Sequence, residues 1–247
     1  MTDLFGFTRS ILANRYALLT PAGFVHGNLP GWQKAVCNVL ISPAMGARFS
    51  QVLITLEQDG ECQGNTAANQ YFIYLIEGAA SMLIDERRHR LEPGSYVYLP
   101  AGKDVRIRSS AVGTRILIFQ KPYQPLRGAT APDGLVGQVR EINAEPFLGN
   151  EAARLQVLLP DQPAFDMAVN IFTYQPGATL PFVETHVMEH GLLMLQGQGI
   201  YRLDSDWHPV RAGDVIWMAP YCPQWFVAMG TEPASYIYYK NVNRDPI

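Results

Sequence analysis

Features that commonly reveal a protein's function are scarce in this sequence of 247 residues. It has three cysteines, Cys37, Cys62 and Cys222, and they are widely spaced. An odd number of distant cysteines without a CxxC pair argues against a disulfide framework and against a thiolate zinc site. We therefore expect free thiols and a reducing, cytoplasmic location.

Charge and long apolar runs are also limited. Charged residues make up 17% of the chain, the net charge is -3, and no basic stripe is present, which excludes binding along a phosphate backbone. No apolar run approaches the ~20 residues that a membrane-spanning helix requires. Residues 1–9 lack a basic segment followed by an apolar one, so we expect no signal peptide. These features predict a small-molecule partner and neither nucleic acid nor membrane.

Helical periodicity is rare, whereas short apolar runs bounded by turn residues are frequent. Runs of five to nine residues rich in Val, Ile, Leu, Tyr and Phe predict β-strands. The 21 glycines and 18 prolines suit a chain with many turns, and 48% apolar residues suffice for a large core. The strands expected are 51–56, 71–76, 80–84, 95–99, 114–121, 166–174, 191–196, 199–203, 214–218 and 235–240.

The sequence also repeats itself. Three blocks in the second half each stand 119 positions after a similar block in the first half: 77–78 and 196–197, 93–98 and 212–217, and 115–121 and 234–240. A constant offset over three blocks indicates two copies of one β-barrel. We expect an N-terminal barrel at 1–122, a linker at 123–144 that is rich in proline and glycine, and a C-terminal barrel at 145–247.

The C-terminal copy carries a cluster of polar side chains. On a strand, alternate residues share one face, so Glu184, His186, Met188 and His190 are expected to point together into the barrel. A buried carboxylate and two buried imidazoles are costly unless they bind something, and a divalent metal would satisfy them. Glu189 is expected to face outward.

The spacing of these residues resembles the two cupin motifs. The usual first motif has two histidines, then a glutamate and a glycine. Here glutamate stands at the first position and histidine at the third. The motifs are Glu184-x-His186-x3-His190-x6-Gly197, then Gly213 and Pro220, with Gln224 eleven residues after Gly213. The resemblance implies an all-β bicupin, two antiparallel jelly-roll barrels related by the internal repeat.

The altered ligand set resembles the (S)-ureidoglycine aminohydrolase family of allantoin breakdown. The similar segments span nearly the whole chain: 12–15, 17–21, 184–186, 189–191, 235–238 and 243–245. The resemblance implies a Mn²⁺-dependent hydrolase of purine catabolism that converts (S)-ureidoglycine and water to (S)-ureidoglycolate and ammonia.

The resemblance also implies residue roles. The implied metal ligands are Glu184, His186, His190 and Gln224. The implied substrate contacts are Tyr236 and Lys240, with Glu184 and Gln224 near both metal and substrate, and Glu184 and Lys240 are the implied catalytic groups.

This chemistry is coherent in its own terms. Mixed carboxylate, amide and imidazole donors suit Mn²⁺. Lys240 lies four residues after Tyr236 and shares its strand face, where its ammonium can pair with a substrate carboxylate or move a proton. The aligned Lys121 in the other copy leaves a second interpretation open, a solvent-exposed lysine at a strand end.

In the N-terminal copy, the four ligand positions are occupied by Asn65, Ala67, Tyr71 and Val105. We expect no metal there and a structural or interface role for this barrel. Two alternatives to the hydrolase stay open: another metal-dependent cupin enzyme, an isomerase or Fe²⁺ dioxygenase, and a non-enzymatic cupin that binds a small ligand. Because bicupins expose long barrel edges, we also expect a homo-oligomer.

Overall fold

The structure is a computed structural model that describes residues 7–84 and 86–245. Its contacts divide the chain into two compact units, each built on curled antiparallel sheets. The first barrel comprises Val25–Asn143 and Leu158–Asp166. The second comprises Ala144–Val157, the chain from Met167 onward, and the described residues up to Phe24. The expected all-β fold is confirmed.

The first barrel contains one sheet in the order β11-β8-β5-β10-β4-β9-β6-β7, with β3 paired to β4. The sheet curls because the two halves of the long strand β4 pair with different strands. Residues 50–56 pair with β10, and residues 61–65 pair with β9. Between these halves Asp59 has a φ of 58°, a conformation that bends the strand. The elements are β3 (Trp32–Ile41), η2 (Pro43–Met45), β4 (Ser50–Asn65), β5 (Asn69–Glu77), β6 (Ala80–Ile84), β7 (Arg87–Leu91), β8 (Ser95–Leu99), β9 (Asp104–Ser109), β10 (Thr114–Pro122), β11 (Leu135–Gln138) and η3 (Val139–Glu141).

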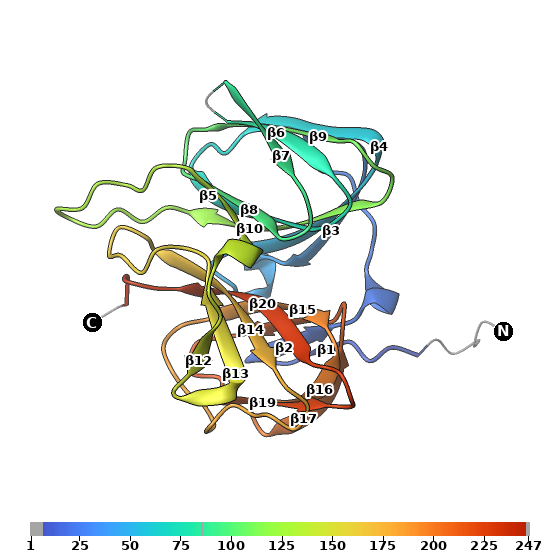
Figure 1. Cartoon of the computed structure of the whole chain (residues 1–247), viewed down its shortest axis with the longest axis vertical. Coiled ribbons are helices and arrows are strands. Elements are labelled where there is room, and N and C mark those ends of the chain that lie inside the picture. The colour runs from blue at the N-terminus through green and yellow to red at the C-terminus, as the bar shows by residue number, and fades with distance from the viewer. Residues whose placement is uncertain (1–6, 85, 246–247) are drawn as a thin grey trace. The chain divides into compact units, whose positions relative to one another are not determined.

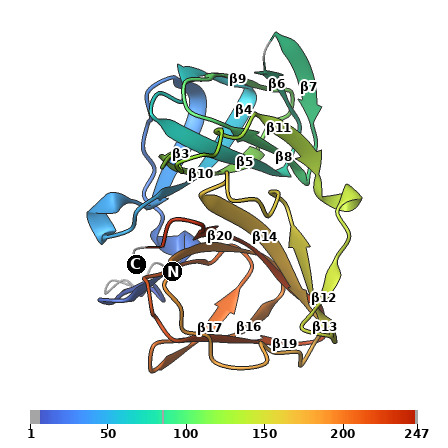
Figure 2. The same ribbon diagram turned by 90° about the vertical axis from the view of Figure 1, so that its left-hand side faces the viewer.

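The second barrel places two sheets face to face (Figures 1 and 2). Within the described residues, one sheet has eight strands in the order β1-β2-β18-β15-β20-β14-β13-β12, and the other has three in the order β17-β16-β19. The elements are β1 (Ile11–Leu12), β2 (Tyr16–Leu19), η1 (Pro21–Gly23), β12 (Glu145–Phe147), β13 (Asn150–Val157), β14 (Met167–Tyr174), β15 (His190–Gln196), β16 (Gln198–Leu203), β17 (Asp206–Arg211), β18 (Val215–Met218), β19 (Gln224–Met229) and β20 (Ala234–Asn241).

Aromatic side chains fill much of the space between these two sheets. Phe172 and Tyr236 from the larger sheet pack with Tyr201 and Phe226 from the smaller one, and all four are buried. Each such ring contributes roughly 2 kcal/mol by leaving water. The core therefore fixes the faces of β14, β16, β19 and β20 that point inward.

The N-terminal residues complete the second barrel. Strand β2 pairs antiparallel with β18, and β1 pairs with β2, so the blue strands run beside the orange ones in Figure 1. The guanidinium of Arg9 makes a bidentate contact with the buried carboxylate of Asp214, at 2.8 and 3.0 Å. This division differs from the expected boundaries, which assigned the N-terminal residues to the first barrel. It also gives Leu158–Asp166 to the first barrel.

All ten strands expected from the sequence are present, with ends that differ by a few residues, except that β4 extends nine residues further, to Asn65. The segment expected as a linker contains β11, which adds an edge strand to the first barrel by pairing with β8. All three cysteines are buried and free. In the described part of the chain, no helix has the length and apolarity needed to cross a membrane.

Candidate metal centre and active site

The polar cluster lies at the start of two strands and in the segment before one of them. His190 is the first residue of β15 and Gln224 the first of β19. Glu184 and Gln224 exchange both backbone hydrogen bonds, at 2.9 and 3.0 Å. The backbone N–H of Tyr221 donates to the carbonyl of His186 at 2.7 Å. These backbone contacts bring the four side chains to one place.

The strand expected from Glu184 to His190 does not form. Residues 185–189 are irregular, and Glu184 makes only an isolated bridge. Strand alternation therefore fails for Glu189, which was expected to face outward. It is fully buried, and its backbone N–H donates to Asn241 at 2.8 Å. The residues meet because backbone hydrogen bonds to Tyr221 and Gln224 hold the irregular segment in place, rather than because they share a strand face.

Two backbone carbonyls fix the orientation of both imidazoles. Nδ1 of His190 lies 3.1 Å from the carbonyl oxygen of Tyr239, and Nδ1 of His186 lies 3.2 Å from that of Met188. A carbonyl only accepts hydrogen bonds, so each Nδ1 carries the proton and each Nε2 keeps a lone pair. A hydrogen bond of this kind is typical of histidines that bind metals.

Burial keeps both rings neutral. Desolvation lowers the pKa of His190 to about 3, with a smaller contribution from His186. Desolvation also lowers the pKa of His186. Burial raises the pKa of Glu184, against the opposing effect of the Lys240 charge. At neutral pH the histidines are therefore uncharged donors of lone pairs.

The donor set fits a divalent cation. The two Nε2 atoms lie 3.2 Å apart, close to the ~3 Å that separates neighbouring nitrogen ligands on one ion. Without an ion, two facing lone pairs repel each other. The amide of Gln224 is 2.9 Å from Nε2 of His186, and Oε2 of Glu184 is 3.9 Å from it. Two imidazoles, a carboxylate and an amide suit a hard-to-borderline ion.

The amide of Gln224 adds a further candidate metal donor to those of the ionisable residues. Within the described residues, no group of three or more His, Cys, Asp or Glu side chains forms a metal cluster by itself. The assignment of Nε2 and Oε1 in a glutamine amide follows the hydrogen-bond network. A half-turn of the Gln224 amide presents its oxygen to the space where the two Nε2 atoms point.

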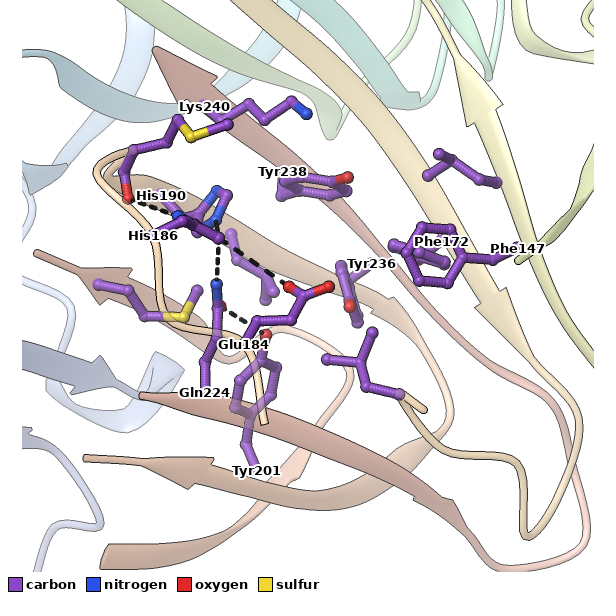
Figure 3. Close-up of a pocket in the computed structure, with 15 residues that line it drawn as sticks. Phe147, Phe172, Glu184, His186, His190, Tyr201, Gln224, Tyr236, Tyr238 and Lys240 are labelled. Atoms are coloured by element: carbon purple, nitrogen blue, oxygen red, sulfur yellow. Dashed lines mark hydrogen bonds and ion pairs between the residues drawn. The ribbon is translucent and has the colours of Figure 1, made fainter. Parts of the chain in front are cut away.

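These residues open onto a cavity of about 150 Å³. Figure 3 shows the metal-ligating candidates on one side and aromatic side chains on another. All six residues expected at the site line this cavity, namely Glu184, His186, His190, Gln224, Tyr236 and Lys240. The remaining lining residues are Phe147, Leu155, Phe172, Leu180, Met188, Leu192, Tyr201, Met218 and Tyr238.

Strand register places the lysine beside the histidine. Lys240 on β20 is the direct cross-strand partner of His190 on β15. Tyr236 is fully inside the barrel, and its hydroxyl lies 3.1 Å from that of Tyr174. Side chains of directly paired residues lie about 5 Å apart at Cβ, and Lys240 is one of the residues that line the cavity.

Two tyrosines of the cavity are absent from the sequence prediction. Tyr238 lies between Tyr236 and Lys240, so the alternation that joins those two residues on one face also includes it. Tyr201 lies on β16, and its hydroxyl is 3.5 Å from Oε1 of Gln224. Nothing in the sequence near the motifs singles out Tyr201.

The first barrel has other residues at the positions that correspond to the candidate metal donors. Val105 is buried in the apolar core, and Asn65 donates to Asp104 at 2.9 Å. The counterpart of Lys240 is not Lys121, as the offset of 119 suggested. The cross-strand partner of Tyr71, which corresponds to His190, is Gln120.

Lys121 faces the opposite side of β10 from Gln120. Its ammonium forms an ion pair with the fully buried carboxylate of Asp166 at 2.5 Å. The observation that favoured a solvent-exposed Lys240, an equivalent lysine in the other copy, therefore falls away.

The chain is similar in sequence and in fold to known proteins. The family described as "Cupin domain" matches residues 170–239. A protein of Oryza sativa subsp. japonica named probable (S)-ureidoglycine aminohydrolase is 39% identical, over 100% of this chain and 79% of its own. The (S)-ureidoglycine aminohydrolase of Escherichia coli is 34% identical, over 99% and 98%.

A solved structure is similar throughout. The crystal structure of the Ylba protein from Escherichia coli has a TM-score of 0.87 and 33% identity, covering 97% of this chain and 96% of that one. Its likeness extends over both barrels, and the relatives named above are matched along the whole of this sequence. The chain is therefore an enzyme of the (S)-ureidoglycine aminohydrolase family, with the bicupin fold.

Proposed function

We propose that this enzyme hydrolyses (S)-ureidoglycine to (S)-ureidoglycolate and ammonia, with Mn²⁺ held by Glu184, His186, His190 and Gln224. The reaction accords with the names of the relatives. One structural observation carries the metal proposal: two imidazoles, each with its proton on Nδ1, turn their Nε2 lone pairs toward each other at 3.2 Å. A bound cation explains why a neutral pair, with His190 buried and His186 half-buried, is arranged in this way.

The remaining residues of the cavity bind and orient the substrate. Lys240 supplies a positive charge for the substrate carboxylate, and Tyr236 offers a hydroxyl on the same face of β20. Phe147 and Phe172 pack edge to face at 4.8 Å and exclude water from one wall. Held between a cationic end and an apolar wall, a small acid is restricted in orientation, which favours reaction.

The chemical change replaces a C–N bond with a C–O bond. Water loses a proton and the amine leaves as ammonia, so one proton must pass between them. A free oxygen of Glu184 can accept that proton and return it to the leaving nitrogen, and Lys240 is the other proton-bearing group beside the cavity. When bound, the cation supplies Lewis-acid polarisation and a template for the substrate.

The test is ammonia release from (S)-ureidoglycine generated in place, since a compound with an amine and a ureido group on one carbon decomposes spontaneously. Protein loaded with Mn²⁺ is compared with protein stripped by chelator and with buffer alone. We expect release above the spontaneous rate only with the metal. Equal rates in all three samples would overturn the proposal, and oxygen uptake in a parallel electrode measurement would indicate a dioxygenase instead.

A further inference from the structure

The hydroxyl of Tyr238 has a defined hydrogen-bond direction. Tyr238 lines the cavity between Tyr236 and Lys240, on the inward face of β20 (Figure 3). Its ring packs edge to face against His190, with centroids 5.5 Å apart and planes at 74°. The ring therefore has little freedom, and the position of its hydroxyl is set by the sheet and by the imidazole.

Asn170 determines which way this hydroxyl can donate. It is the direct cross-strand partner of Tyr238 on β14, it is 3% exposed, and its Nδ2 donates to the tyrosine oxygen at 3.0 Å. Its Oδ1 is buried without a hydrogen-bond partner among the described residues. The flipped amide would leave both of its N–H donors without an acceptor.

The tyrosine oxygen is thus an acceptor for Asn170, and its own proton remains for another group. Among the described residues, no acceptor lies within hydrogen-bond distance of that proton. Lys240 stands two residues further along the same strand face, and its cross-strand neighbour on β14 is the small Ala168. The cavity therefore presents an ammonium and a hydroxyl donor side by side.

We propose that Tyr238 donates a hydrogen bond to the carboxylate of the substrate, which Lys240 holds by charge, and that Asn170 is the positioning residue that keeps this proton available. The inference rests on the proposed function, since it names the substrate group that the pair recognises. A carboxylate only accepts hydrogen bonds, so it satisfies both donors at once. Specificity for an acid over its neutral amide then resides in Lys240 and Tyr238 together.

Binding of hydantoate tests the inference without turnover, because this compound is the substrate without its amino group. Calorimetry of Mn²⁺-loaded protein is expected to show about 10–100-fold weaker binding to the Tyr238→Phe variant than to the wild type, at equal metal content. The neutral N-carbamoylglycinamide is expected to lose less affinity than hydantoate, because its carbonyl oxygen accepts the hydrogen bond without a charge. Tyr74→Phe, which removes a buried hydroxyl from β5 in the first barrel, is the matched control and leaves both affinities unchanged.

Asn170→Leu tests the positioning role, because leucine has the branched shape of asparagine and lacks its N–H donors. We expect it to weaken hydantoate binding in the wild-type background and to have no further effect in the Tyr238→Phe background. Equal effects in both backgrounds would show that Asn170 acts independently of Tyr238 and would overturn its assigned role. A non-additive result supports it.

The outcomes separate this inference from the proposed function. Unchanged hydantoate affinity in Tyr238→Phe, or an equal loss for the amide, overturns the carboxylate contact and leaves the deamination standing. Conversely, hydantoate binding that depends on Tyr238, in a protein that releases no ammonia from (S)-ureidoglycine, overturns the function and supports the contact. The same variant is also expected to raise KM more than it lowers kcat in the ammonia assay.

Discussion

At the residue scale, the candidate metal centre depends on how each imidazole is held. His186 and His190 lose their freedom to change tautomer because Met188 and Tyr239 accept a hydrogen bond at Nδ1. The lone pairs at Nε2 are therefore prepared before any ion arrives, which lowers the entropic cost of binding. Burial keeps the rings uncharged, so protons do not compete with the metal at neutral pH.

The first prediction concerns these ligands. His190→Ala or Glu184→Ala should weaken Mn²⁺ binding by at least about 100-fold and abolish the metal-dependent ammonia release. Circular dichroism should still show the native all-β spectrum, because the surrounding sheet is unchanged. Elemental analysis after dialysis gives the metal content, and His26→Ala, an exposed histidine of the first barrel, serves as the control. A metal-free variant that retains activity would overturn the assignment.

Lys240 yields the second prediction. Lys240 lines the cavity, and removal of its charge should affect the substrate and not the metal. We expect Lys240→Met to keep its Mn²⁺ and to lose about 100-fold or more in kcat/KM. Unchanged kinetics would return this residue to the role of a solvent-exposed lysine.

At the element scale, the sequence predicted that these side chains lie together but not the backbone that brings them together. Alternation placed Glu184, His186 and His190 on one strand face, and all three line the cavity. The segment is nevertheless irregular from 185 to 189. It is held by contacts with the distant turn at Tyr221 and with Gln224. Local periodicity carries no information about such long-range contacts, which also explains the buried Glu189.

The N-terminal strands provide the third prediction. Arg9 is the partner of the fully buried Asp214, whose carboxylate otherwise accepts, among the described residues, only a backbone N–H from Arg211. Removing the guanidinium leaves a buried charge poorly compensated, so Arg9→Ala should lower the free energy of unfolding by about 2 kcal/mol and the melting temperature by about 4–8 °C. Arg106→Ala, at an exposed ion pair with a 3.7 Å separation, should change neither. Equal melting temperatures for the wild type and Arg9→Ala would contradict the prediction.

At the scale of the whole molecule, the repeat was detectable from the sequence, but its register in the last strand was not. Both faces of β10 are buried, since Ile116, Leu117, Ile118 and Phe119 are each 4% exposed or less. Because both faces are apolar, the sequence of such a strand can be aligned with that of the other copy at two registers one residue apart. The strand pairing, such as that of Gln120 with Tyr71, shows that the offset there is 120 rather than 119.

The chain also does not divide where its composition changes. The proline- and glycine-rich segment at 123–144 suggests a boundary after which the second barrel is complete. In the structure that barrel also uses residues from the N-terminus, because β2 covers the edge of β18. Nothing in residues 7–24 alone indicates which barrel they join, since β1 and β2 are short and β2 pairs with β18, about 200 positions away.

This organisation gives the last prediction. A polypeptide of residues 145–247 alone should aggregate or melt at low temperature, because it exposes the edge of β18 and leaves Asp214 without Arg9. A second polypeptide, with residues 7–24 joined to 145–247 through a flexible linker, should recover soluble protein and Mn²⁺ uptake. Size-exclusion chromatography and elemental analysis measure both. If the shorter polypeptide already folds and binds metal as well as the longer one, the N-terminal strands are dispensable to the second barrel.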